Sequence, residues 1–308
     1  MKSSARRILV PVCSLLLLVS PMLVSCSKET DSEQPSHAPA VSLPVDPPRV
    51  QLIDAGTAPQ QVMAFHDSGS SQDIDLAFSD AFTQGTGTLA EVSETPEVPQ
   101  QPQVLRAHAH ATTTGQRDIA VVLTQPTYSQ PDRAEDARGI DGFRLGWTAD
   151  STGRASSVTV AAPTQASDSA RKLAEVHAMK LVAQPIIFPT EPIGIGARWS
   201  VDNRVAGDST LLRSTTYTLQ HIDGDNVELQ ADIIQRPAVT SLPLNTAAGS
   251  ELKVHSTQSL STGTLRINLG QPLPTSGHFA VSTRVRYASD GSDTTVYQDF
   301  TSGVDFGK

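Results

Sequence analysis

Residues 217–233 read YTLQHIDGDNVELQADI, and this stretch decides the fold class. Apolar residues alternate with polar ones on both sides of Asp223-Gly224, which is a strong signal for two antiparallel strands joined by a tight turn. Val227, Leu229 and Ala231 share one parity, so one face of the second strand is apolar. The stretch therefore predicts an antiparallel sheet with one face packed on a core.

The same alternation recurs along most of the chain, with turn residues between the segments. It marks further strands near 74–78, 104–111, 118–124, 143–147, 158–160, 265–269, 281–287 and 296–300, and short apolar pieces at 50–54 and 62–65 also fit strands. Polar segments at 84–103 and 129–139 predict long exposed loops. We therefore expect a mainly β fold, built as a large, curved antiparallel sheet.

A single helix is expected, over about 167–183. Ser167 or Asp168 can cap its first turn, and Pro185 stops it. The apolar face of this helix is broad, which predicts that it packs on the sheet. A set of strands on each side of the helix permits two related halves.

The amino terminus has the order of a secretory signal. Lys2, Arg6 and Arg7 precede an apolar run at 8–23. A membrane-spanning helix needs about 20 apolar residues, and this run is shorter and interrupted by proline. The segment therefore predicts export from the cytoplasm.

The apolar run ends in Leu23-Val24-Ser25-Cys26, which resembles the lipobox of bacterial lipoproteins. The resemblance implies a signal peptide at 1–25 and lipidation of Cys26 with diacylglycerol and fatty acids such as palmitate. It also implies a cell-envelope protein, anchored by lipid on the extracytoplasmic face of the cell membrane. An ordinary secreted protein with a small-residue cleavage site is the alternative.

The residues after the lipobox fit such an anchor. Cys26 is the only cysteine left after cleavage, because Cys13 lies in the signal segment. Residues 26–48 are rich in Ser, Pro and Glu and predict a disordered tether. Residues 49–308 then form the β-rich extracytoplasmic domain.

The charge of the chain limits its partners. The formal net charge is −9, and loss of the three basic residues of the signal segment makes it −12. No cluster of Lys and Arg is available for phosphates, so a nucleic-acid partner is not expected. We expect contact with the membrane through the lipid on Cys26, and an envelope lipid or protein as a further partner.

Residues 192–199 read PIGIGARW, a Pro-x-Gly-x-Gly-x-x-Trp motif. The motif resembles one in uncharacterised envelope lipoproteins of high-GC Gram-positive bacteria, and the likeness covers roughly 143–306. That resemblance implies no activity. Gly194 and Gly196 predict backbone bends or close approach. Trp199 is expected in the core, with ligand stacking as the weaker alternative.

Two histidines are the candidates for a metal site. His108 and His110 are two residues apart and would face the same side of a strand. A zinc site needs about three or four ligands, and no further ligand can be assigned from the sequence. A solvated pair of histidines is therefore the favoured interpretation, and no cofactor is expected.

No catalytic residue is predicted. Ser169 and Lys172 match Ser-x-x-Lys, but the other motifs of the penicillin-binding enzymes are missing from the sequence. Three functions remain. A non-catalytic binding or interaction module is favoured; a carrier of a lipid or other apolar ligand in a cavity between sheet and helix is the first alternative, and an unrecognised hydrolase is the second.

Overall fold

Strands dominate the computed structural model, which describes residues 37–205, 211–243, 251–289, 291 and 293–307. The predicted signal segment and Cys26, the predicted lipidation site, lie outside the described residues. Residues 35–308 form one compact unit. Within the part of the chain that is described, no helix is long and apolar enough to cross a membrane.

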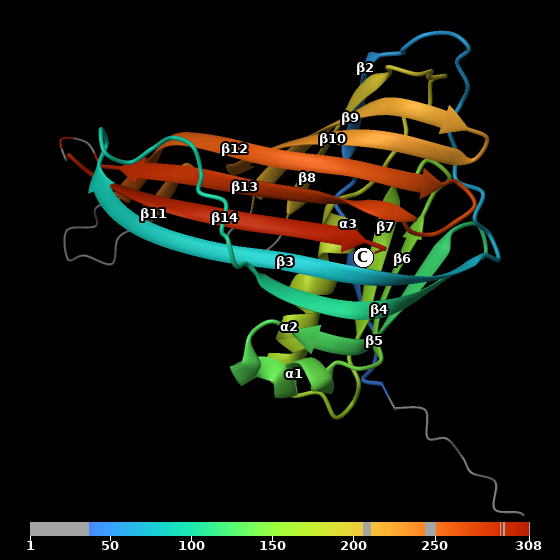
Figure 1. Cartoon of the computed structure of the whole chain (residues 1–308), viewed down its shortest axis with the longest axis horizontal. Coiled ribbons are helices and arrows are strands. Elements are labelled where there is room, and N and C mark those ends of the chain that lie inside the picture. Colours follow the sequence, from blue (N-terminus) through green and yellow to red (C-terminus); the bar gives the residue numbers. More distant parts are fainter. Residues whose placement is uncertain (1–36, 206–210, 244–250, 290, 292, 308) are drawn as a thin grey trace, which may run out of the picture. The chain divides into compact units, whose positions relative to one another are not determined.

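The strands form one antiparallel sheet. They are β1 (Val41–Pro44), β2 (Arg49–Asp54), β3 (Ser71–Thr88), β4 (Gln103–Thr114), β5 (Asp118–Tyr128), β6 (Phe143–Ala149), β7 (Ala155–Ala161), β8 (Arg198–Val205), β9 (Leu211–Asp223), β10 (Asn226–Pro237), β11 (Ser241–Pro243), β12 (Glu251–Asn268), β13 (Ser276–Ala288) and β14 (Thr294–Phe306). Their order is β1-β7-β6-β5-β4-β3-β14-β13-β12-β10-β9-β8-β2, and β11 pairs with β12 (Figure 1). The order ends at β1 and β2, so the sheet is open. The expected antiparallel β architecture is confirmed.

The hairpin at Asp223-Gly224 forms as its sequence predicts. Asp223 pairs with Asn226, and Gly224 has a φ of +56°, the left-handed conformation that a tight hairpin turn requires. Val227, Leu229 and Ala231 are all buried. These alternate residues therefore lie on the face of β10 that packs on the core.

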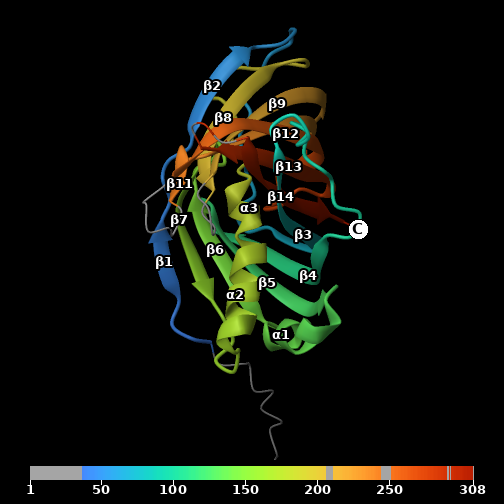
Figure 2. The same cartoon turned by 90° about the vertical axis from the view of Figure 1, so that its left-hand side faces the viewer.

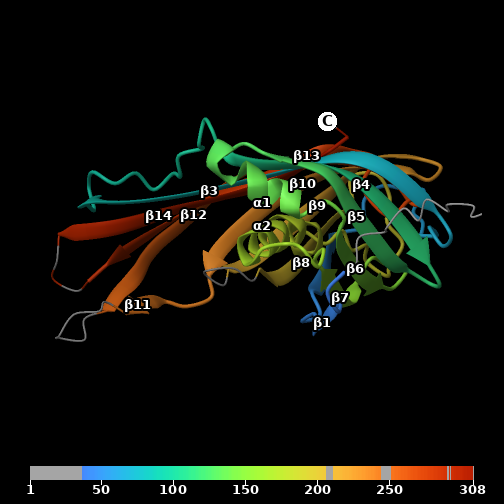
Figure 3. The same ribbon diagram turned by 90° about the horizontal axis from the view of Figure 1, so that it is seen from below.

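Strand β3 is much longer than its apolar pattern suggests. It continues through residues 84–88, which the sequence predicts as loop, because β14 pairs with it from Leu76 to Thr88. Backbone hydrogen bonds need no apolar side chains, so composition hides this extension. Strands β3, β12 and β14 consequently extend well beyond the helices (Figure 3).

The predicted helix is present as α2 (Asp168–Ala178) and its short continuation α3 (Lys180–Ala183). Ser167 Oγ accepts a hydrogen bond from the Ala170 amide at 3.1 Å and caps the first turn. Ala170, Ala174 and Ala178 form a buried stripe whose small side chains allow close packing. Figure 2 shows α2 and α3 against one face of the sheet.

The expectation of a single helix is wrong. The segment predicted as a polar loop contains the 3₁₀ turn Pro131–Arg133 and the helix α1 (Ala134–Gly139). Ala137 is the one buried residue of this short helix, so it shows no apolar period. Tertiary contacts hold it instead, since Ser169 Oγ donates to Asp136 Oδ1 at 2.6 Å.

The amino-terminal part of the domain differs from expectation in two ways. Strand β1 lies within the segment predicted as a tether, and it pairs with β7 from Val41 to Pro44. Residues 62–65 form no strand, although Met63 and Phe65 are buried. Their backbone is held by single contacts, such as the 2.7 Å bond from the Phe65 amide to Ser151 O.

The Pro-x-Gly-x-Gly-x-x-Trp motif brings two loops together. The Gly194 amide donates to Ala55 O at 2.9 Å, and a Cβ on Gly194 would lie 1.9 Å from Thr57 O. Gly196 has a φ of +84°, and a Cβ there would meet no atom within 4 Å. Gly194 is needed because a side chain there would overlap the backbone of Thr57, and Gly196 is needed because its backbone is in the left-handed conformation.

We expect Gly194→Ala to lower the free energy of unfolding by about 3 kcal/mol, because the added methyl group would overlap backbone. Gly196→Ala is the matched control. Its cost should be about 1 kcal/mol, since only the left-handed conformation is strained. Urea unfolding followed by circular dichroism measures both. Equal losses for the two variants would contradict the close approach at Gly194.

Candidate ligand-binding groove

A groove of about 550 Å³ lies between helices α2–α3 and the sheet. Residues of β3, β8, β9, β10 and β14 line it together with residues of the two helices. We call it the α2–α3 groove. Binding sites for small molecules have volumes of about 300 to 1,000 Å³, so the α2–α3 groove is large enough to be one.

Apolar side chains form much of the wall. Phe82 is 57% exposed, and its ring centroid lies 5.2 Å from that of Phe300 on the adjacent strand. Val176 on α2 is 45% exposed, and Met179 and Leu211 also contribute to the apolar lining. Exposed apolar side chains that share one groove are typical of a surface that a ligand covers.

A buried arginine, Arg213 on β9, lies at the polar part of the groove. Only 4% of its surface is exposed. With the Gln235 amide oriented so that its oxygen faces Arg213, this oxygen accepts from Nε at 2.9 Å and from Nη2 at 2.7 Å. Arg213 Nη1 donates to Gln184 Oε1 at 2.8 Å and to Ala183 O at 3.2 Å. All of these acceptors are neutral.

A network of neutral side chains fixes the position of Arg213. In that orientation the Gln235 nitrogen donates to Thr283 Oγ1 at 3.0 Å. Thr283 Oγ1 in turn lies 2.9 Å from Ser259 Oγ. Gln184 Nε2 donates to Tyr217 Oη at 3.1 Å. The guanidinium is therefore held from both the sheet and the α3 end.

Two cationic side chains of the described residues line the groove, Lys180 and Arg213, and only Lys180 has a carboxylate partner among those residues. Lys180 Nζ donates to Asp80 Oδ1 at 2.7 Å and to Ser79 O at 2.8 Å. Among the described residues, no carboxylate forms an ion pair with Arg213. Burial lowers the pKa of Arg213 to about 10, so it keeps its charge at neutral pH.

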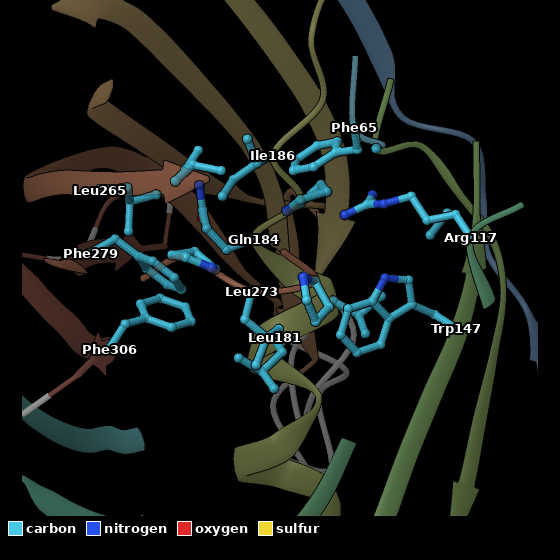
Figure 4. A pocket seen from close by; sticks show the side chains of 17 residues that line it. Phe65, Arg117, Trp147, Leu181, Gln184, Ile186, Leu265, Leu273, Phe279 and Phe306 are labelled. Carbon is cyan, nitrogen blue, oxygen red and sulfur yellow. The ribbon is translucent and has the colours of Figure 1, made fainter. Parts of the chain in front are cut away.

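A second cavity is lined mainly by buried side chains but is small. Its volume is about 60 Å³, enough for a few water molecules. Figure 4 shows Trp147 and Arg117 on one side of it and Phe279 and Phe306 on the other. Arg117 is paired with Asp67 through Nε at 3.1 Å. We do not regard this cavity as a ligand site.

Trp199, the candidate for ligand stacking, is completely buried. Its indole nitrogen donates to Ile187 O at 2.7 Å, and its ring packs against Phe188 and Tyr217 with centroid distances of 5.8 and 5.6 Å. It does not line the α2–α3 groove. Trp199 therefore packs in the core and does not face a ligand in this groove.

His108 and His110 project from β4 on one side and each contacts a carboxylate on β3. His108 Nδ1 lies 3.0 Å from Asp75 Oδ1, and His110 Nδ1 lies 2.9 Å from Asp73 Oδ1. All four side chains are solvent-exposed. Within the described residues, no three His, Cys, Asp or Glu side chains have a geometry that could hold a metal ion.

Sequence reasoning missed Arg213, and it assigned neither Asp73 nor Asp75 to the histidine pair. A signal for Arg213 exists, because it has the same parity as Leu211 and Tyr217, and both of these neighbours are buried. Asp73 and Asp75 are two residues apart in β3, as His108 and His110 are in β4. Pairing these two strands in sequence would have predicted the cluster.

We expect the pKa of His108 to lie above 6.5, because its hydrogen bond to Asp75 favours the charged imidazole. NMR titration of the ring protons measures it. Asp75→Asn should lower this pKa, whereas Asp118→Asn should not, since Asp118 bonds to Thr148 instead. The stabilising interaction is complete below pH 6.5 and is lost as the pH rises through the raised pKa. A pKa that Asp75→Asn leaves unchanged would contradict the contact.

Comparison with known proteins gives no relative from which a function could be transferred. No protein family, no curated protein and no solved structure matches this chain. Any functional proposal therefore depends on the α2–α3 groove and on the sequence features described above.

Proposed function

We propose that this chain is a lipid-anchored protein of the cell envelope that carries a lipid or other apolar ligand in the α2–α3 groove. This function is a non-catalytic binding role, with the carrier as its specific form. The observation that carries the proposal is the groove itself, with its volume of about 550 Å³ and its partly exposed apolar wall. A ligand that covered Phe82 and Val176 would gain apolar contact at both.

The geometry of the groove supports a carrier better than a hydrolase. Of the two carboxylates of described residues that line the groove, Asp80 is engaged by Lys180. Arg213 is held by amide and carbonyl oxygens, which suits an electrostatic binding role. The hydrolase therefore has less support than the carrier.

We further propose that the sheet is curved around α2–α3. Support comes from the main hydrophobic cluster, which contains Val158 of β7 and Val201 of β8, strands near opposite ends of the sheet order. Ala170 and Ala174 of α2 belong to the same cluster. A bend of the sheet around the helix explains how strands so distant in the order share one core.

The anchor is the second part of the proposal. It rests on Leu23-Val24-Ser25-Cys26 and on the apolar run before it. A carrier held at the membrane surface by lipid would stay close to a source of apolar ligands. The resemblance to bacterial lipoproteins thus agrees with the proposed role of the groove.

We expect the full chain with Cys26→Ala to bind an uncharged apolar probe, such as phenylnaphthylamine, with an increase in fluorescence. Phe82→Ser should weaken this binding about ten-fold, because a loss of ~1.4 kcal/mol of apolar contact corresponds to that factor. Ile234→Ser is the matched control, since Ile234 is 67% exposed but does not line the groove. Equal effects of the two substitutions, or no binding at all, would rule out the groove as a carrier site.

Loss of the proposed lipid has a separate outcome. Cys26→Ala should release the protein from the membrane fraction or leave its precursor uncleaved, because the Cys26 sulfur is the atom to which the diacylglyceryl group would be attached. Fractionation followed by immunoblotting and intact mass measurement checks this. Ser25→Ala is the control, since alanine keeps a small residue before Cys26. An unchanged membrane fraction and mass for Cys26→Ala would refute lipidation.

A further inference from the structure

We infer that the α2–α3 groove selects an amphiphile, with its carboxylate or phosphate headgroup against Arg213 and its acyl chain along Phe82 and Phe300. This inference rests on the proposed carrier function and adds the chemical class of the ligand. It depends on three features of the groove: an uncompensated charge, a fixed donor and an adjoining apolar wall.

The charge of Arg213 is the first feature. Buried charges in proteins are normally paired, because removal from water is costly. Arg213 is 4% exposed, and its acceptors among the described residues are the neutral oxygens of Gln235, Gln184 and Ala183. An anion in the groove would supply the missing counter-charge.

The nearby ionic groups do not supply that charge. Asp80 is bound to Lys180. Glu175 also lines the groove, but it forms no ion pair with Arg213 among the described residues. Lys180 and Arg213 are close enough that the arginine helps to lower the lysine pKa, after the larger effect of burial and against the opposing effect of Asp80. Of these two cations, only Lys180 has a carboxylate partner among the described residues.

The hydrogen bonds of Arg213 are the second feature. A guanidinium has five N–H donors. The four bonds described above use Nε, one hydrogen of Nη2 and both hydrogens of Nη1. One Nη2 hydrogen is left without an acceptor among the described residues. Because the rest of the group is fixed, an anion that accepts this hydrogen meets a preorganised donor.

The apolar wall is the third feature. Phe82 and Phe300 come from adjacent strands, β3 and β14, where they form a cross-strand pair. They line the same groove as Arg213. A ligand with only an anionic group would leave these rings uncovered, and a ligand with only a hydrocarbon chain would leave Arg213 uncompensated. An amphiphile satisfies both.

The test compares ligands that share one chain length. Lauric acid, dodecyl phosphate and dodecanol each displace phenylnaphthylamine from the full chain with Cys26→Ala, and the dissociation constants are compared at fixed salt. We expect at least one of the two anions to bind at least ten-fold more tightly than the alcohol. Arg213→Gln should remove this preference while dodecanol binding stays within about two-fold, a change worth ~0.4 kcal/mol. Arg213→Lys should retain part of the preference.

Arg171→Gln is the matched control. It also replaces an arginine by glutamine, but Arg171 lies on α2 and does not line the groove. It should leave the preference unchanged. Equal binding of acid, phosphate and alcohol by the unmodified groove would overturn the inference while leaving the carrier function intact, whereas a failure of all three to bind would overturn the carrier function as well. The comparison of the three ligands on the chain with an intact Arg213 does not need the Arg213→Gln variant, so it tests the inference even if that variant fails to fold.

Inorganic phosphate separates the two sources of the anionic group. For an amphiphile site, millimolar phosphate should not displace dodecyl phosphate. Displacement by phosphate alone would overturn the role of the acyl chain and identify a site for the free anion.

Discussion

The continuous backbone ladder from β3 through β14 and β13 to β12 is the constraint on which the rest of the structure depends. Each of these strands has 13 or 18 residues, and each buried amide and carbonyl along them must find a partner. The helices are too short to cover such strands along their whole length. The sheet therefore has a part covered by helix and a part that extends beyond it (Figure 3), and the α2–α3 groove lies between α2–α3 and the sheet.

A network of polar side chains reaches that groove through Gln235 and Arg213. Ser259, Thr283, Gln235 and Arg213 hydrogen-bond in sequence across β12, β13, β10 and β9. Such a network specifies one arrangement of its members, because a misplaced neighbour would leave a buried donor unpaired. It also leaves a formal charge beside a hydrocarbon surface. Packing alone does not require that combination.

Local signals predicted much of the sheet. Asp223-Gly224 predicted its hairpin because two residues are enough to specify a tight turn. Ser167 marked the start of the helix because its side chain can cap the first turn, and Pro185 marked the end because proline cannot continue a helix. The long end of β3 and the helix α1 were missed for a common reason. Both depend on tertiary partners, β14 for residues 84–88 and Ser169 for Asp136, which composition does not reveal.

The candidate groove was harder to predict than the fold. Phe82 and Arg213 are 131 positions apart in the sequence, and only the sheet order brings β3 and β9 to the same groove. The parity of Arg213 suggested an inward direction, but the absence of a nearby carboxylate is a three-dimensional property. A cavity between sheet and helix could be named in advance as a class of site, while its residues could not.

The edge position of β1 has a mechanical consequence. The chain passes from Cys26 to the sheet through β1, whose four residues pair with β7 alone and whose Val41 and Leu43 side chains are largely exposed. A pull on the amino-terminal side of the domain therefore loads the hydrogen bonds of His37 and Ala38 first, and then this strand. Because β1 contributes nothing to the groove, its detachment would lengthen the connection, by about 3.3 Å per residue, without deforming the binding surface. Along the chain, β1 thus separates the proposed anchor from the proposed ligand site.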